Sequence, residues 1–178
     1  MPSGRPDRLT RPAVNSERLR YRPVDLGTLD AFHDLVQDEH VRRYMMDGLR
    51  FPREWSAERV RESLALGDER GVCIWLAHDK DTGELVGFCG FWVPPGGMEP
   101  ELLYALRESW SGRGLATEMG RAAIAHARTQ PGFDEIAADV DEINAGSVRV
   151  LEKLGFERVG VKPGAFGNVL LLRLPADR

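Results

Sequence analysis

The sequence predicts an α+β domain whose sheet is mixed but mostly antiparallel, with elements in the order β-α-α-β-β-β-α-β-α-β-β. Two β-rich runs at 72–79 and 85–92 flank a short turn, which is typical of an antiparallel hairpin. A second hairpin is predicted near the C-terminus, from "FERVGV" and "NVLLLRL". A helical stretch joins the runs at 101–108 and 135–140, and such a crossover makes those two strands parallel.

The first strand and the first helix follow from patterning near the start of the chain. The run "ERLRYRPV" at 17–24 alternates polar and apolar residues, as a half-buried strand does. Asp25 stands where it can cap the helix that follows. One face of that helix consists of residues spaced i, i+3, i+4 and i+7, namely Leu29, Phe32, His33 and Val36.

The segment 41–55 is expected to be irregular, because Gly48 and Pro52 interrupt it. Ser56 is then expected to cap a second helix that runs to Gly67. Two more helices are predicted in the second half of the chain. One follows Gly114, and the other covers "AGSVRVLEKLGF" and ends at Gly155, which suits a left-handed helix end.

Length and composition indicate one domain. The chain has 178 residues, of which 42% are hydrophobic and 29% are charged, as is typical of globular proteins. Residues 1–16 are rich in Pro, Ser, Gly and Arg, so we expect a flexible tail there and a single domain over 17–178. The exposed edge of the terminal hairpin would allow a homodimer.

Several classes of function are disfavoured. A net charge of −4 argues against a broad nucleic-acid-binding face and does not repel amines. No apolar run approaches the roughly 20 residues of a membrane span, and the N-terminus lacks the apolar core of a signal peptide, so we expect a cytoplasmic protein that does not bind membranes. The histidines are scattered, which predicts no metal site. Cys73 and Cys89 lie in apolar runs and are expected to be buried, reduced thiols.

The stretch "WSGRGLATE" at 110–118 places two glycines immediately before a helix. The first turn of a helix has N–H groups without intrahelical partners, and these groups attract anions. Gly112 and Gly114 permit a tight turn and let phosphate oxygens approach. Thr117 adds a hydroxyl, and Glu118 must point away from a bound anion. The segment therefore predicts a pyrophosphate cradle, with a tight turn shaped by glycine alone as the alternative.

Two blocks together resemble a known family. "ELLYALRESWSGRGLATEMGRAAIAHA" at 101–127 and "INAGSVRVLEKLGFERVG" at 143–160 resemble the GCN5-related N-acetyltransferase (GNAT) superfamily, and its RimJ/RimL-like branch in particular. The superfamily signature Arg/Gln-x-x-Gly-x-Gly/Ala appears here as Ser111-x-x-Gly114-x-Ala116, so the first position departs from the pattern. The resemblance extends over residues 17–174.

This resemblance implies a GNAT fold, with helices on both faces of a sheet that splays between its fourth and fifth strands. Acetyl-CoA, the implied co-substrate, would lie in the opening. The backbone at Leu106 would pair with its pantetheine, and the Asn144 side chain would orient pantetheine rather than cap a helix. Arg113 would contact a CoA phosphate or remain a surface residue. The pyrophosphate would be held by the backbone of Ser111, Gly112, Arg113, Gly114, Leu115, Ala116 and Thr117.

The resemblance also suggests catalytic groups. Glu101, at the start of the central strand, is the candidate general base, and Asp139 is the second choice; an exposed strand-end carboxylate is the alternative reading of Glu101. Many family members protonate the thiolate with a Tyr, but Leu151 occupies that position here. Ser147 is the nearest substitute, and simple helix capping is its alternative role.

Substrate selection is expected from the segment 41–55 and the turn at 161–168. Tyr44, Met45 and Phe51 are candidate walls of an amine pocket, and Tyr104 lines either the acyl site or the core. The predicted function is acetyl-CoA-dependent N-acetylation of a primary amine, on a protein N-terminus or a small molecule. The alternative is a non-catalytic acyl-CoA-binding or sensing module.

Overall fold

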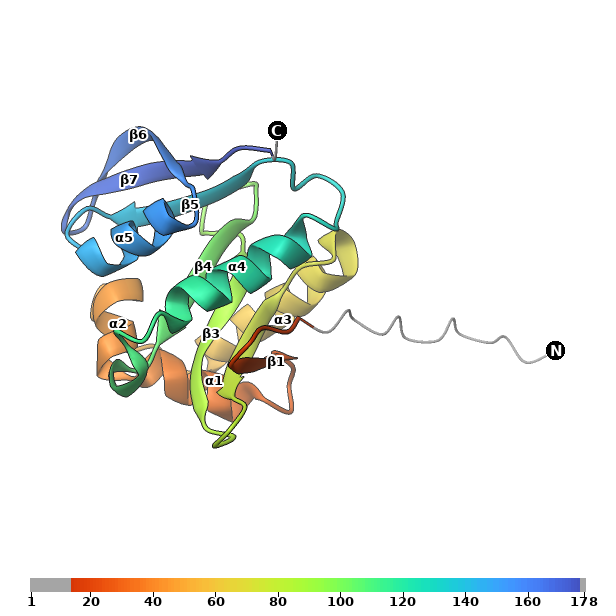
Figure 1. Cartoon of the computed structure of the whole chain (residues 1–178). Coiled ribbons are helices and arrows are strands. Elements are labelled where there is room, and N and C mark those ends of the chain that lie inside the picture. The colour runs from red at the N-terminus through yellow and green to blue at the C-terminus, as the bar shows by residue number, and fades with distance from the viewer. Residues whose placement is uncertain (1–13, 177–178) are drawn as a thin grey trace.

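The computed structural model describes residues 14–176, and the part of the predicted tail at 1–13 lies outside them. The described strands form one sheet in the spatial order β1-β2-β3-β4-β5-β7-β6 (Figure 1). All neighbouring strands are antiparallel except β4 and β5, so the mixed, mostly antiparallel sheet is confirmed. The strands are β1 (Leu19–Pro23), β2 (Ile74–Asp79), β3 (Leu85–Trp92), β4 (Glu101–Leu106), β5 (Ile136–Asp141), β6 (Glu157–Gly164) and β7 (Gly167–Leu174).

Helices cover both faces of the sheet, as predicted. Helices α4 and α5 lie on one face, and α1, α2 and α3 pack on the other (Figure 1). A short 3-10 helix, η1, connects β4 to α4. The bounds are α1 (Leu29–Gln37), α2 (Glu39–Met45), α3 (Arg53–Arg70), η1 (Glu108–Trp110), α4 (Leu115–Ala127) and α5 (Ala145–Lys153).

Strand β4 is buried on both faces, which explains its nearly continuous apolar sequence. Leu102 and Leu106 belong to the core beneath α4 and α5, together with the fully buried Met119 of α4. Leu103 points to the opposite core, where it joins Phe32 of α1. Because alternate residues of one strand serve two cores, β4 is fixed in the middle of the molecule.

The sheet opens between β4 and β5. Only one pair, Glu101 with Ala137, is in parallel register between these strands, whereas β4 pairs with β3 along its whole length. The splay implied by the family resemblance is therefore present. The fold places an opening directly beside the loop that leads into α4.

Helix α2 corrects the expectation of an irregular segment at 41–55. The Asp38 side chain caps this helix by accepting hydrogen bonds from the backbone N–H groups of His40 and Val41, at 3.0 and 3.2 Å. Gly48 and Pro52 interrupt only the segment between α2 and α3. Gly48 takes a positive φ of 73° after α2, and Pro52 precedes α3.

Two predicted caps are also corrected. Helix α3 begins at Arg53, so Ser56 lies inside it, fully buried, with its hydroxyl 2.9 Å from Nδ1 of His33. Asp25 does not cap α1; it accepts a hydrogen bond from the N–H of Thr28 and so closes the turn before the helix. Asp25 thus bonds locally in the turn before α1, whereas Ser56 bonds across to His33 of α1.

Residues before 17 already pack onto the domain. Val14 is buried in the core beneath α4, and Asn15 bridges Arg20 in antiparallel fashion. The Ser16 hydroxyl lies 2.9 Å from the phenol oxygen of the buried Tyr21. Residues 14–16, expected to belong to the tail, are therefore packed against the domain.

Candidate active site

The loop between β4 and α4 presents unpaired backbone N–H groups to the surface. Ser111 to Gly114 are exposed, and in the described part of the chain the N–H groups from Gly112 to Thr117 meet no hydrogen-bond acceptor. They lie at the N-terminal end of α4, where the helix dipole adds partial positive charge. This arrangement fits a diphosphate group.

The two glycines of the loop are required by backbone conformation. Gly112 and Gly114 have φ values of 75° and 77°, in the left-handed region that side chains disfavour. An added Cβ would meet no atom within 4 Å at Gly112, and at Gly114 its nearest neighbour would be the Arg18 guanidinium at 3.7 Å. Packing within the protein would therefore tolerate a methyl group at either position, whereas the turn itself would not.

The side chains of the loop turn away from the free N–H groups. Arg113 lies over the ring of Trp110, 4.7 Å from its centre, and donates a hydrogen bond to the carbonyl of Ser109 at 2.9 Å. Leu115 and Thr117 are buried against the sheet. The loop thus offers an anion its backbone, and Arg113 lies at the outer rim.

The backbone N–H and C=O of Leu106 face the opening. The N–H of Arg107 donates to the carbonyl of Val86 on β3 at 2.9 Å. Because ladder bonds in an antiparallel pair alternate along the strand, the N–H and C=O of Leu106 point away from β3. They face the side where β5 has diverged, and an extended amide chain can add there as a strand would.

The start of α5 carries a cluster of polar groups beside the opening. Asn144 caps the helix by accepting a hydrogen bond from the N–H of Ser147 at 3.1 Å, so the capping alternative is the one observed. The Ser147 hydroxyl is not a cap; it lies 2.8 Å from the phenol oxygen of Tyr104 on β4. That phenol is also 3.2 Å from the Ser147 carbonyl. This contact joins β4 to α5 beside the opening between β4 and β5.

Burial raises the pKa of Tyr104 to about 12, although its hydrogen bond with Ser147 acts in the opposite direction. The phenol therefore stays protonated at neutral pH and acts as a hydrogen-bond donor. If it donates to Ser147 Oγ, the serine proton is free for a third group.

Glu101 lies at the closed end of the opening, on the other face of β4. Burial, together with the charge of Asp139 on β5, raises the pKa of Glu101 above its ordinary value, and Lys162 and Arg173 partly oppose this shift. Asp139 is itself paired: Lys162 Nζ lies 2.6 Å from its Oδ2, and an Arg173 nitrogen lies 3.7 Å from its Oδ1. A carboxylate with a raised pKa in a partly buried position is suited to accept a proton near neutral pH.

The residues predicted to line the amine pocket do not all lie together. Tyr44 is exposed and stands edge-on to the ring of His40, and Phe51 stacks on Trp55 with 4.4 Å between ring centres. Met45 lies deeper, at an apolar cavity beneath α2. Tyr104 belongs to the opposite face of the sheet, so it is not part of this group.

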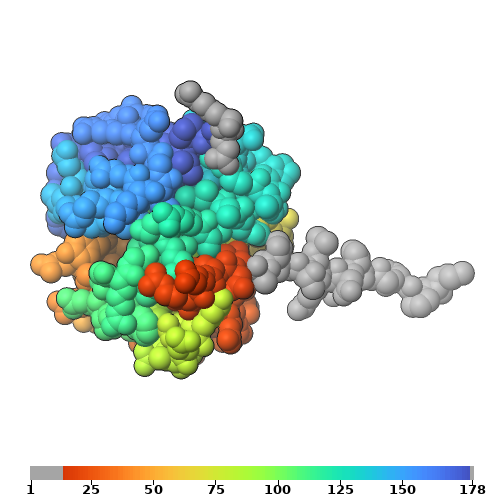
Figure 2. Space-filling view, in the orientation of Figure 1, coloured from red at the N-terminus to blue at the C-terminus, as the bar shows by residue number. Residues whose placement is uncertain are grey.

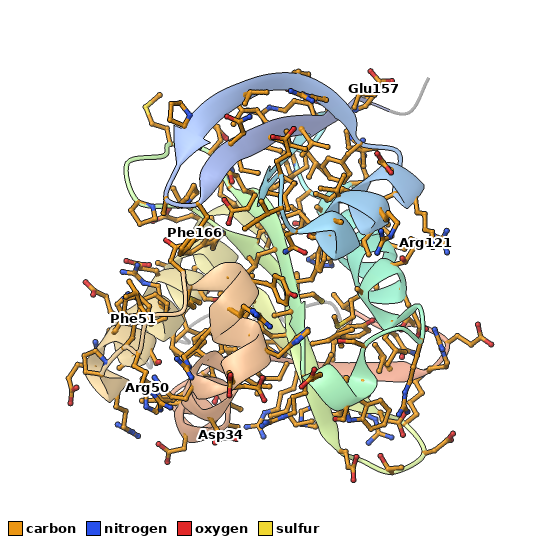
Figure 3. The ribbon with its side chains drawn as sticks, turned by 90° about the vertical axis from the view of Figure 1, so that its left-hand side faces the viewer. Asp34, Arg50, Phe51, Arg121, Glu157 and Phe166 are labelled. Atoms are coloured by element: carbon orange, nitrogen blue, oxygen red, sulfur yellow. The ribbon has the colours of Figure 1, made fainter. Side chains whose placement is uncertain are left out.

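The hairpin tip between β6 and β7 also borders this side of the molecule. Figure 3 shows Phe166, at the tip, on the same side as Phe51. Phe166 is half exposed. Burial and the charge of Asp47, which follows α2 in the chain, raise the pKa of Asp141 at the end of β5.

Three further observations concern thiol chemistry, metal binding and membrane-spanning helices. Cys73 and Cys89 are both buried, and burial raises the pKa of the Cys89 thiol, which disfavours a nucleophilic thiolate. Among residues 14–176, no group of three or more His, Cys, Asp or Glu side chains is arranged to hold a metal ion. No helix in this described range is long and apolar enough to cross a membrane.

Comparisons with known proteins agree with this geometry. A family model described as an Acetyltransferase (GNAT) domain matches residues 18–157. The uncharacterized protein YkkB of Bacillus subtilis (strain 168) is 32% identical over 148 residues, which cover 79% of this chain and 82% of YkkB.

Solved structures share the fold. RimL, the ribosomal L7/L12 α-N-protein acetyltransferase in complex with coenzyme A, matches with a TM-score of 0.77 at 18% identity, over 93% of this chain and 98% of RimL. The aminoglycoside acetyltransferase AAC(6')-Ib, also in complex with coenzyme A, matches with a TM-score of 0.67 at 21% identity, over 88% of this chain and 94% of its own. The family model, the relative and the shared fold lead to one conclusion: this chain belongs to the GNAT family of acetyltransferases, whose enzymes use acetyl-CoA as co-substrate.

Proposed function

We propose that this protein transfers the acetyl group of acetyl-CoA to a primary amine by direct attack, with both substrates bound together. The support is the geometry of one opening in the sheet. Free N–H groups at 112–117 lie at one end, and Glu101 and the Tyr104–Ser147 pair lie along β4. When bound, acetyl-CoA supplies an activated acyl carbonyl and a thiolate leaving group.

The proposed binding mode uses backbone groups almost entirely. The N–H groups from Gly112 to Thr117 hold the diphosphate, and the N–H and C=O of Leu106 pair with the pantetheine amides. Arg113, stacked on Trp110 at the rim, is placed to approach a phosphate from outside. Asn144 acts by holding the first turn of α5 in place, because its side-chain oxygen is committed to the cap.

Glu101 is the proposed general base. An aliphatic amine is protonated near neutral pH and must lose a proton before it attacks. The burial of Glu101 raises its pKa, so the carboxylate is a better proton acceptor than an exposed one. Asp139 is the poorer candidate, because its Oδ2 is held by Lys162 at 2.6 Å.

Ser147 is the proposed partner of the leaving thiolate. In the proposed arrangement the Ser147 hydroxyl accepts the phenol hydrogen of Tyr104 across their 2.8 Å contact, which is the closer of the phenol's two acceptors, and the serine hydrogen is then free to face the opening. The phenol, with its pKa raised to about 12, is a poor proton source for a thiolate of ordinary pKa about 8.5. Tyr104 therefore orients Ser147 and stabilises charge by hydrogen bonding, without giving up its own proton.

The acceptor is proposed to be a cationic amine, on a peptide N-terminus or a small molecule. Asp139 and Asp141 lie on the face of β5 that continues the face of Glu101, and Lys162 and Arg173 pair with Asp139 there, so Glu101 and Asp141 are the carboxylates proposed to attract the amine. Tyr44 and Phe166 are exposed aromatic side chains that can cover the apolar part of a substrate. RimL and AAC(6')-Ib, by their names, act on these two kinds of amine, and this chain is proposed to use one of them.

The second candidate is an acyl-CoA-binding module without turnover. It is favoured by Leu151, a buried aliphatic residue at the position where many family members have a tyrosine. The contact between Tyr104 and Ser147 weighs against it, because it brings a phenol to the opening from a different strand.

A panel of amines with a thiol-release readout separates the two candidates. Turnover of any amine by the parent protein supports the enzyme, and binding of CoA without turnover of any amine supports the module. Glu101→Gln should then reduce kcat by about 100-fold if Glu101 is the base, with CoA affinity unchanged. Glu99→Gln is the matched control, because its carboxylate is 73% exposed and pairs only at the surface with Arg70.

A further inference from the structure

The N-terminal segment before β1 lies against the beginning of α4. Figure 2 shows this segment on the surface directly beside the α4 region. Arg18 makes the principal contacts: its backbone N–H and its Nε each donate to the Glu118 carboxylate at 2.7 Å. Its Nη1 donates to the carbonyl of Arg113 at 2.9 Å. One side chain thus joins the first turn of the helix to the loop in front of it.

The bond to Arg113 fixes the direction of an N–H group. In a trans peptide, the C=O of one residue and the N–H of the next point in opposite directions. Because the carbonyl of Arg113 points toward Arg18, the N–H of Gly114 points away from Arg18, to the exposed side of the loop. Glycine at this position removes the local steric preference, so an external contact is needed to hold the peptide in one orientation.

The bond to Glu118 solves an electrostatic problem. A carboxylate in the first turn of α4 would repel an anion bound at the N-terminal end of that helix. Glu118 is instead directed to the N-terminal segment, where it also accepts a hydrogen bond from the Ser16 hydroxyl at 2.6 Å. Burial alone would raise the pKa of Glu118, but these hydrogen bonds and the charge of Arg18 lower it, so the carboxylate stays ionised and paired.

We propose that Arg18 is a positioning residue for the diphosphate of acetyl-CoA. It holds the Gly114 N–H toward the ligand and neutralises Glu118 beside the ligand. This inference rests on the proposed function, since it assumes that the loop at 112–117 binds the diphosphate. The arrangement also ties the N-terminal segment to α4, because the Glu118 side chain is only 13% exposed and accepts three hydrogen bonds there, so the test must separate binding of the diphosphate from stability.

The test is Arg18→Gln, measured by steady-state kinetics with acetyl-CoA and with S-acetylpantetheine, which has the same reacting group without the diphosphate. We expect KM for acetyl-CoA to rise about tenfold with kcat unchanged, and kcat/KM for S-acetylpantetheine to stay the same. Adding Glu118→Gln should recover part of the loss, because the unpaired charge is then removed. Arg20→Gln is the matched control: Arg20 is an exposed arginine in β1, two residues after Arg18.

A loss of equal size with both acyl donors would overturn the proposal, because it would show general damage to the site. An unchanged KM for acetyl-CoA would overturn it as well. Arg18→Lys guards against misfolding: it keeps the charge beside Glu118 but not the forked donor, and an intermediate KM is expected. If the parent protein binds no CoA in a thermal-shift assay, the proposed function fails. If the parent protein binds CoA but Arg18→Gln leaves KM for acetyl-CoA unchanged, only the inference about Arg18 fails.

Discussion

Tyr104→Phe removes a single oxygen and tests the proposed leaving-group side of the site. In the structure this oxygen lies 2.8 Å from the Ser147 hydroxyl and 3.2 Å from its carbonyl, in a partly buried position. A neutral hydrogen bond of this kind contributes about 1 kcal/mol. For a domain of this size, such a loss lowers the thermal midpoint by about 2–4 °C. If the same bond also orients Ser147 toward the thiolate, kcat should fall about tenfold, equivalent to about 1.4 kcal/mol.

The assay is a double-mutant cycle with Ser147→Ala, read by thiol release and by thermal unfolding. Because Tyr104 acts through Ser147, each single variant should lower kcat and the double variant should lower it no further than the more damaging single variant. KM for acetyl-CoA should change little. Tyr21→Phe is the control for loss of a phenol hydroxyl: its hydrogen bond with Ser16 is also partly buried, and any effect passed on to Glu118, which Ser16 contacts, would alter KM for acetyl-CoA and not kcat.

Two outcomes would refute this reasoning. If Tyr104→Phe lowers the thermal midpoint as Tyr21→Phe does while kcat is unchanged, then Tyr104 only joins β4 to α5. If the losses in kcat are additive in the double variant, then Tyr104 and Ser147 act independently and the orienting role of Tyr104 is wrong.

Four further predictions concern charge and backbone conformation. The raised pKa of Glu101 means that the base form is lost, as pH falls, at a higher pH than for an ordinary glutamate, so kcat/KM should show an acid limb that Glu101→Gln removes. The raised pKa also means that Glu101 favours the folded state only while it is protonated. This contribution is lost as pH rises through the pKa of Glu101 in the folded state. Glu101→Gln should therefore raise the thermal midpoint at neutral pH, but not at a pH below the pKa of Glu101 in the unfolded state. Lys162→Met should move the acid limb of the parent profile to still higher pH, because Lys162 lowers the pKa of Glu101 and also pairs with Asp139. Gly114→Ala should destabilise the fold by about 1–2 kcal/mol in chemical denaturation, because its φ of 77° is left-handed, and should weaken CoA binding by calorimetry.

The parts of the fold that could be predicted are those that local pattern determines. The hairpin at 72–92 and the crossover between β4 and β5 follow from β-rich runs, turn residues and helical spacing, and the structure has both. Helix α2 is not predicted, because Gly48 and Pro52 indicate an irregular segment over 41–55, whereas both residues lie after the end of the helix at Met45. Asp38, followed by residues whose N–H groups it caps, was the signal available in the sequence.

The pairing of residues in the site could not be predicted in the same way. Tyr104 and Ser147 are 43 residues apart, and Arg18 and Glu118 are 100 apart. No spacing or composition marks such pairs, because they depend on how α4 and α5 pack against segments that are distant in the sequence. Tyr104 and Ser147 are named with the family resemblance and Glu118 with the glycine loop, whereas Arg18 is not predicted, and the contact within each pair comes from tertiary structure alone.

The arrangement along β4 explains how one strand can serve both ends of an acetyl transfer. Glu101 and Tyr104 are three residues apart, so their side chains leave opposite faces of the strand. The proposed base thus lies on the face that it shares with Asp139 and Asp141, and the phenol lies on the face of α5, near the proposed thiolate. If both groups shared one face, the carboxylate of Glu101 would accept the phenol or serine hydrogen and compete with the thiolate for it. Separation by the strand itself keeps proton removal and thiolate stabilisation from interfering, and it predicts that Glu101→Gln and Tyr104→Phe affect kcat independently.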